Sequence, residues 1–95
     1  MATTLVIEHG MEDFDAWKRV FDEHAVNRKE HGCISEELLR SSDESLLIMN
    51  AMRWPSRAAA EGFLADPSLG EAMHRAGVTG QPRITFWDTV QTAEF

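Results

Sequence analysis

The feature that most constrains this chain is an apolar stretch near its centre, within residues 45–54. The side chains of residues 46–52 are apolar at even and odd positions alike, apart from Asn50. Successive side chains of a β-strand point to opposite faces, so this composition is typical of a strand covered on both faces. One layer of helices covers only one face of a sheet. We therefore expect a second copy of the chain to cover the other face, in a homodimer that packs sheet against sheet.

The remaining elements are predicted from residue periodicity, capping residues and turn signals. They are a strand at Thr3–His9, a helix at Asp13–His31, a strand at Cys33–Arg40, a helix at Arg57–Ala65, a second helical piece from Asp66 that stops at Gly77, a loop at residues 77–82 and a strand at Arg83–Thr92. With the central strand at Ser45–Trp54, the order is β-α-β-β-α-β. This order predicts an α+β, ferredoxin-like fold in a single domain of residues 1–95, with a four-stranded antiparallel sheet and its helices on one face.

The helix predicted at Asp13–His31 has an unusual inward face. One stripe of side chains, spaced by three or four residues, consists of Phe14, Trp17, Phe21, His24 and Arg28. The first three are apolar rings suited to packing on a sheet, whereas a histidine and an arginine are costly to bury unless they are paired or hydrated. A stripe that begins as core and ends in polar groups indicates a helix that runs towards a pocket.

Composition and charge argue against several classes of function. The net charge is −7 and the nine Lys and Arg residues are scattered, so we expect no nucleic-acid partner. No apolar run approaches the roughly 20 residues that cross a bilayer, and the first residues lack signal-peptide features, so we expect no membrane association. The single cysteine, Cys33, cannot form an internal disulfide and favours a cytoplasmic location. The sequence contains no recognisable metal-binding motif or phosphate-binding loop, so we expect no metal and no cofactor.

Several segments resemble the dimeric α/β-barrel superfamily, which includes antibiotic-biosynthesis monooxygenases, heme-degrading monooxygenases and small cyclase-like proteins. The resemblance covers nearly the whole chain, and it is carried by Asp13–Lys18 with Phe21–His24 and Arg28, by Trp54-Pro55-Ser56, and by Phe63–Pro67 leading to Ala72–His74. It implies a ferredoxin-like domain that forms a dimeric α/β barrel.

Two branches of this superfamily suggest site residues. The cofactor-free monooxygenases oxidise polycyclic phenols to quinones with an Asn and a Trp on the third strand, which Asn50 and Trp54 resemble. They also use a tyrosine, and this chain contains none. The heme-degrading members use an axial histidine in the second helical region, and His74 is similarly placed.

The candidate catalytic residues are His24, Arg28 and Asn50. His24 titrates near neutrality and is expected to act as the base, while Arg28 and Asn50 are expected to bind the oxyanion. The alternatives are structural: Arg28 pairs with Glu23, Glu36 or Glu37 while His24 lies half-exposed, and the Asn50 amide makes a hydrogen bond within the dimer. The candidates for substrate binding are Trp54, Trp17, Phe21, Met52, His74 and His9.

The sequence thus predicts a small enzyme that acts on a hydrophobic, aromatic small molecule. By resemblance, it is a cofactor-independent monooxygenase or a cyclase-like protein. One alternative is a non-catalytic dimer that binds a small ligand in the same pocket. A second alternative is a heme-binding or heme-degrading protein that uses His74.

Overall fold

The computed structural model describes residues 2–95, which form one four-stranded antiparallel sheet and four short helices. The strands are β1 (Thr3–Met11), β2 (Ser35–Arg40), β3 (Leu47–Trp54) and β4 (Val78–Trp87). Their spatial order is β2-β3-β1-β4, with antiparallel pairing throughout. The predicted α+β, ferredoxin-like fold is therefore confirmed.

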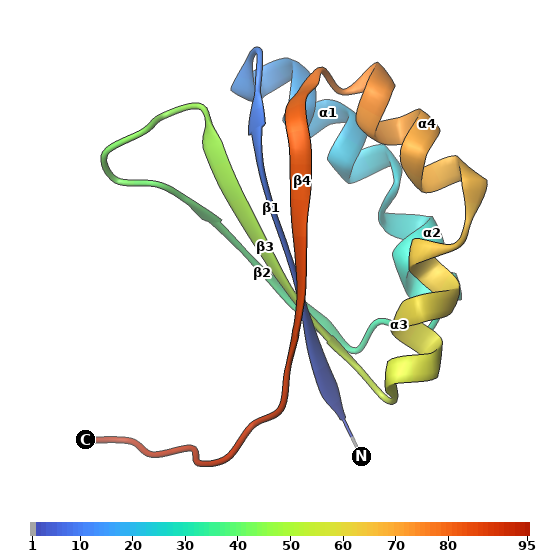
Figure 1. The fold of residues 1–95 in the computed structure, drawn as a ribbon, viewed down its shortest axis with the longest axis vertical. Coiled ribbons are helices and arrows are strands. Elements are labelled where there is room, and N and C mark those ends of the chain that lie inside the picture. The colour runs from blue at the N-terminus through green and yellow to red at the C-terminus, as the bar shows by residue number, and fades with distance from the viewer. Residues whose placement is uncertain (1) are drawn as a thin grey trace.

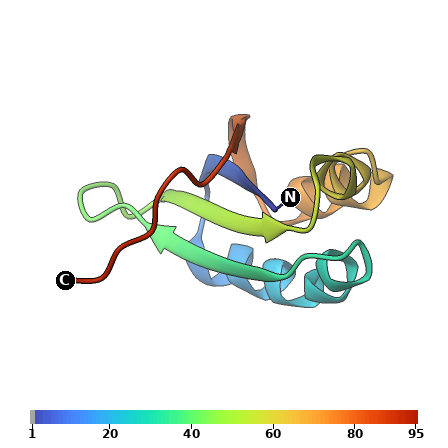
Figure 2. The ribbon, with the colours of Figure 1, turned by 90° about the horizontal axis from the view of Figure 1, so that it is seen from below.

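All the helices lie on the same side of the sheet (Figure 1). They are α1 (Phe14–Glu23), α2 (Ala25–Glu30), α3 (Arg57–Leu64) and α4 (Pro67–Arg75). The helices form two pairs, α1 with α2 and α3 with α4, and the view from below shows the pairs side by side over the sheet (Figure 2). Among residues 2–95, no helix has the length and apolar character needed to cross a bilayer.

Short polar side chains begin three of the helices. The carboxylate of Asp13 accepts a hydrogen bond from the Ala16 backbone N–H at 2.8 Å at the start of α1. Ser56 caps α3, and Asp66 caps α4 just before Pro67, which occupies the first helical position. Proline is tolerated there because the first N–H groups of a helix have no intrahelical partner. These caps fix where each helix leaves the sheet.

The prediction of one helix over Asp13–His31 is wrong in its continuity. The structure divides this segment at His24, whose ψ of 0° departs from the helical value near −42°. The His24 backbone N–H still bonds to the Val20 carbonyl at 3.0 Å, so α2 continues closely from α1 with a change of direction. The break places His24 at a corner between two helices.

The predicted boundaries of the last strand are also wrong. The sequence predicts a loop at residues 77–82, yet β4 already begins at Val78 and ends at Trp87. The register shifts between Glu8 and Gly10 of β1, and β4 carries extra residues there, Pro82 among them. Because β4 is an edge strand, a proline without an N–H is tolerated. Strand β1 is longer than predicted as well, since it ends at Met11.

The core lies between the sheet and the helices. On β3, the inward side chains of Ile48, Asn50, Met52 and Trp54 are buried, whereas Met49 and Arg53 on the other face are exposed. In the single chain, β3 is therefore covered on one face only. The prediction that a second copy covers the other face stays a prediction.

Candidate functional site

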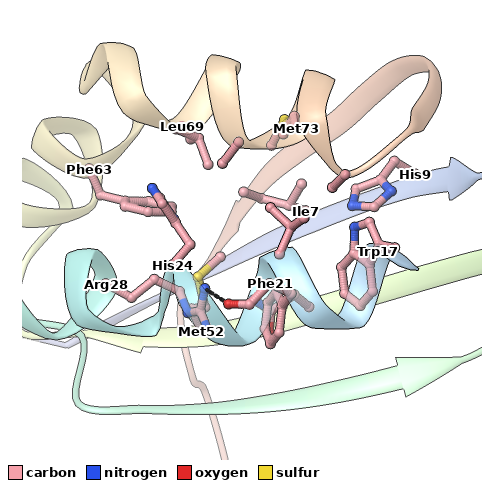
Figure 3. A pocket seen from close by; sticks show the side chains of 14 residues that line it. Ile7, His9, Trp17, Phe21, His24, Arg28, Met52, Phe63, Leu69 and Met73 are labelled. Carbon is pink, nitrogen blue, oxygen red and sulfur yellow. Dashed lines mark hydrogen bonds between the residues drawn. The ribbon is translucent and has the colours of Figure 1, made fainter. Parts of the chain in front are cut away.

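A cavity of about 50 Å³ lies between the inward face of the sheet and the two helix pairs. Figure 3 shows Trp17 and Phe21 of α1 on one side, Leu69 and Met73 of α4 on the other, and Ile7 of β1 between them. Most of the lining is apolar. Four polar side chains interrupt it, and they are His9, His24, Arg28 and Asn50.

The structure brings most of the sequence-predicted site residues around this one cavity. Seven of the nine candidates line it, namely His24, Arg28, Asn50, Trp17, Phe21, Met52 and His9. The structure places Trp54 and His74 elsewhere. The polar end of the α1–α2 stripe does reach a pocket, as the spacing of Phe21, His24 and Arg28 predicts.

Trp54 belongs to the core and does not line the cavity. Its side chain is fully buried at the end of β3 and packs on Phe63, with ring centroids 5.2 Å apart. Within residues 2–95 its buried indole N–H has no hydrogen-bond partner. The expected role of Trp54 as a stacking wall for a ligand is corrected accordingly, because Phe63 lies at the cavity and Trp54 packs against it.

His74 is exposed and points away from the cavity. The inward face of α4 is formed by Leu69, Ala72, Met73 and Ala76, and one residue along a helix turns the side chain by about 100°. His74 is therefore directed outwards and does not line this cavity, and its expected role in substrate binding stays a prediction. The heme hypothesis loses its ligand at this cavity.

Arg28 is buried and its charge is balanced. Its Nε lies 2.8 Å from the Glu36 carboxylate, and its Nη1 donates a hydrogen bond to the Phe21 carbonyl at 3.1 Å, shown as a dashed line in Figure 3. The guanidinium also stacks over the Phe21 ring at 3.8 Å. Of the three glutamates considered, Glu36 is the partner, and the ion pair leaves little positive charge free for a ligand.

The Asn50 amide is held in one orientation. Its Nδ2 donates to the Glu36 carboxylate at 3.2 Å, and an ionised carboxylate can only accept, so the amide nitrogen must face Glu36. The other end, Oδ1, is buried and has no hydrogen-bond partner in the described part of the chain. Asn50 thus contributes an unused acceptor to the cavity wall, and not the donor that an oxyanion partner requires.

His24 sits at the edge of the cavity with its Nε2 engaged. The Ser68 hydroxyl lies 3.2 Å from Nε2, and it also accepts a hydrogen bond from Asn27 at 3.2 Å. Burial lowers the pKa of His24, and the neighbouring Arg28 lowers this pKa further, partly opposed by Asp66. His24 is therefore biased towards its neutral form.

His9 lies on the inward face of β1 and is only 8% exposed. Its Nδ1 is 2.9 Å from the Gly10 carbonyl, and its ring centroid is 5.5 Å from that of Trp17. Burial lowers the pKa of His9, while the hydrogen bond to the Gly10 carbonyl raises this pKa by less. This residue is also neutral near pH 7.

A polar cluster joins α2 to the junction between α3 and α4. The Asp66 carboxylate lies 2.8 Å from the Nε2 of His31 and accepts from the Nδ2 of Asn27 at 2.9 Å. Ser68 completes what we call the Asp66 cluster, which comprises Asn27, His31, Asp66 and Ser68. Sequence reasoning recognised Asp66 as a helix cap but missed its partners, which come from a segment 35 and 39 residues away.

Other lining residues were also missed as site residues. Leu69, Ala72, Met73 and Ala76 recur at helical spacing, which is the signal that marks the inward face of α4. That signal alone cannot separate a core face from a cavity wall. No group of three or more His, Cys, Asp or Glu side chains that could hold a metal ion occurs in residues 2–95.

Comparison with known proteins yields one family and a consistent fold. The model of the family "antibiotic biosynthesis monooxygenase" matches residues 6–75. SnoaB, a cofactor-independent oxygenase from Streptomyces nogalater, is 21% identical with a TM-score of 0.80, over 96% of this chain and 95% of that chain. Rv0793 from Mycobacterium tuberculosis is 17% identical with a TM-score of 0.74, over 99% and 100% of the two chains. At these identities the likeness shows the fold alone. Among curated proteins, none matches this chain.

Proposed function

This chain belongs to the antibiotic biosynthesis monooxygenase family, and on that premise we propose that it is a cofactor-independent monooxygenase acting on a hydrophobic aromatic phenol. The single observation that carries the proposal is the free acceptor of Asn50 in a mostly apolar cavity. A buried amide oxygen without a partner is destabilising, and a ligand hydroxyl that enters the cavity would satisfy it.

The proposed reaction converts a phenol into a quinone with dioxygen as the oxidant. A base removes the phenolic proton, and the electron pair stays on the ring system. The electron-rich anion reduces dioxygen, a carbon–oxygen bond forms at a ring C–H, and cleavage of the O–O bond leaves the new carbonyl. One oxygen atom enters the quinone, and the other leaves as water with the two hydrogens.

The protein's own contribution is desolvation, orientation and proton transfer. Aromatic and aliphatic side chains from both helix pairs enclose the ligand, and Asn50 accepts a hydrogen bond from a hydroxyl group of the ligand other than the one that loses its proton. Arg28 acts indirectly, because it forms an ion pair with Glu36, and the Glu36 carboxylate accepts the hydrogen bond that orients the Asn50 amide. His24 and His9 are the two cavity side chains that can accept a proton near neutral pH.

We also propose that the protein forms a homodimer through the sheet face that the helices leave open. That face carries a groove of about 310 Å³ lined by Val6, Glu8, Met49, Arg83, Thr85 and Trp87. Met49 is 37% exposed and Trp87 is 58% exposed there. Large exposed apolar side chains gathered on one face are typical of an association surface.

Oxygen consumption tests the proposed function. The purified protein is incubated with 1,5-dihydroxynaphthalene and with anthrone, and oxygen uptake is measured together with quinone absorbance. The expected result is uptake of one dioxygen per quinone formed, above the rate of the same phenol without protein. Tight binding of a phenol without uptake would instead identify a non-catalytic ligand-binding protein.

A further inference from the structure

We propose that His9 is the catalytic base of this cavity, and that it takes the phenolic proton on its Nε2. This inference rests on the proposed function, and it replaces His24, the base expected from the sequence. The two histidines differ in what their ring nitrogens already contact.

The Gly10 carbonyl fixes the tautomer of His9. A carbonyl oxygen can only accept, so the Nδ1 that lies 2.9 Å from it must carry the hydrogen. In a neutral imidazole the other nitrogen is then an unprotonated acceptor. Nε2 of His9 has no hydrogen-bond partner in the structure of residues 2–95, so its lone pair is free for a ligand.

His24 offers no comparable group. Its Nε2 is 3.2 Å from the Ser68 hydroxyl, which is itself held by Asn27. Removing a ligand proton there would require the contact to Ser68 to break. His24 is also half-exposed at the rim, whereas His9 is 8% exposed within the cavity wall.

His9 and Asn50 face the same ligand space from adjacent strands. On β1 and β3, His9 is opposite Ile48 and Ile7 is opposite Asn50, so His9 and Asn50 are diagonal neighbours on the inward face. Such neighbours are about 7–8 Å apart, a distance that one aromatic molecule can span. A ligand with two hydroxyl groups can therefore donate one of them to the free oxygen of Asn50 and the other to the free nitrogen of His9.

The proton step is chemically balanced. The O–H bond of the phenol breaks, its proton moves to Nε2, and its electron pair remains on the ligand oxygen. The imidazolium then donates one N–H to Gly10 and the other to the phenolate. When the O–O bond later breaks, His9 returns the proton to the departing oxygen, which leaves as water. Burial lowers the pKa of His9, which keeps the resting ring neutral and able to accept.

The first test measures binding without turnover. The dissociation constants of phenol and of its methyl ether, anisole, are measured by NMR titration of the wild-type protein and three variants. We expect phenol to bind about tenfold more tightly than anisole, because the ether cannot donate to Nε2. His9→Asn, which keeps a donor towards Gly10 but has no group at the Nε2 position, should abolish the difference. His9→Gln and His24→Gln should keep it.

The second test separates a base from a hydrogen-bond acceptor. With the phenol that supports oxygen uptake, His9→Gln should bind normally but turn over about 100-fold more slowly at pH 7. Its rate should recover as the pH approaches about 10, where a phenol ionises by itself. The other ionisable side chains at the cavity are His24 and Arg28, and Arg28 is paired with Glu36. The variant His24→Gln should retain the wild-type pH profile of turnover.

The outcomes are distinguishable. A preference for phenol over anisole that survives in His9→Asn, or that is lost in His24→Gln, would overturn the inference. Full turnover by His9→Gln at pH 7 would also overturn the inference. The same holds if neither phenol nor anisole binds to the wild-type protein. Absence of oxygen uptake by the wild-type protein with every phenol would instead overturn the proposed function.

Discussion

The Glu36 carboxylate accepts a hydrogen bond from the Nδ2 of Asn50 at 3.2 Å, and this contact fixes the orientation of the amide and leaves Oδ1 as its unpaired end. The same carboxylate pairs with the buried guanidinium of Arg28. One side chain of β2 therefore balances a charge and orients an amide.

Glu36→Gln should destabilise the protein by about 2 kcal/mol, because it leaves the buried Arg28 charge without its counter-ion. The control is Glu37→Gln on the same strand, because Arg28 pairs with Glu36 and not with Glu37. We expect this control to change the free energy of unfolding by less than about 0.5 kcal/mol. Urea denaturation of both variants measures the difference, and equal losses would contradict the assignment of Glu36 as the specific partner.

Asn50→Leu should separate stability from function. It removes a half-satisfied amide and fills a similar volume with an apolar group, so the free energy of unfolding should change by no more than about 1 kcal/mol. Binding of 1,5-dihydroxynaphthalene should weaken by about tenfold or more, because the acceptor for its second hydroxyl group is lost. The control is Asn27→Leu, which should lower stability and spare binding. Asn50→Leu with unchanged affinity for 1,5-dihydroxynaphthalene would remove Asn50 from the site.

The Asp66 cluster should make stability depend on pH in the acid range. Hydrogen bonds from His31, then from Asn27 and Ser68, hold the pKa of the Asp66 carboxyl well below its usual range. The folded pKa is thus below the unfolded value of about 3.9, so this stabilisation is present above that pH and is lost as the pH falls below it. Urea denaturation between pH 2.5 and 6 measures the slope.

The matched variants for that measurement are Asp66→Asn and Asp43→Asn. Asp66→Asn should be less stable at pH 6 and should show a flatter dependence at acid pH. Asp43→Asn, in the exposed turn between β2 and β3, should keep the wild-type slope. The same slope in all three proteins would show that Asp66 contributes nothing to acid sensitivity.

Met49→Lys should convert the proposed dimer to a monomer, because it places a charge in the middle of the open sheet face. Val26→Lys is the control, since Val26 is 63% exposed but lies on α2, on the other side of the molecule. Analytical ultracentrifugation at tens of micromolar should find dimers for the wild type and Val26→Lys. A monomeric wild-type protein would overturn the proposed interface.

The order of strands and helices could be predicted from the sequence because it depends on local signals. Asp13, Ser56 and Asp66 are helix caps that can be recognised without a structure, and all three begin helices as expected. The break at His24 could not be found, since no proline or glycine marks it. The early start of β4 was hidden because Gly80 and Pro82 are typical of loops, and only the edge position makes them acceptable in a strand.

The residues of the cavity wall could be predicted where the helical spacing of the sequence determines which way a side chain points. The spacing of Trp17, Phe21, His24 and Arg28 placed all four at one cavity. The identity of their partners was not predictable, since Glu36 and Ser68 come from distant segments whose approach depends on the complete fold. The position of His74 outside the cavity was not predictable either, because its neighbour Met73 occupies the inward position on α4 and a shift of one residue decides which side chain faces the cavity.

The Asp66 cluster and the contact between His24 and Ser68 tie the two helix pairs together over a cavity of about 50 Å³. A cavity that binds benzene has a volume of roughly 150 Å³, so this space is too small for an aromatic ring system while the two helix pairs keep these positions. We therefore expect a ligand to enter when these contacts break and the helix pairs move apart. Association should then be slower than diffusion allows, and a bound molecule should have a long residence time, because the same contacts must break again before it leaves.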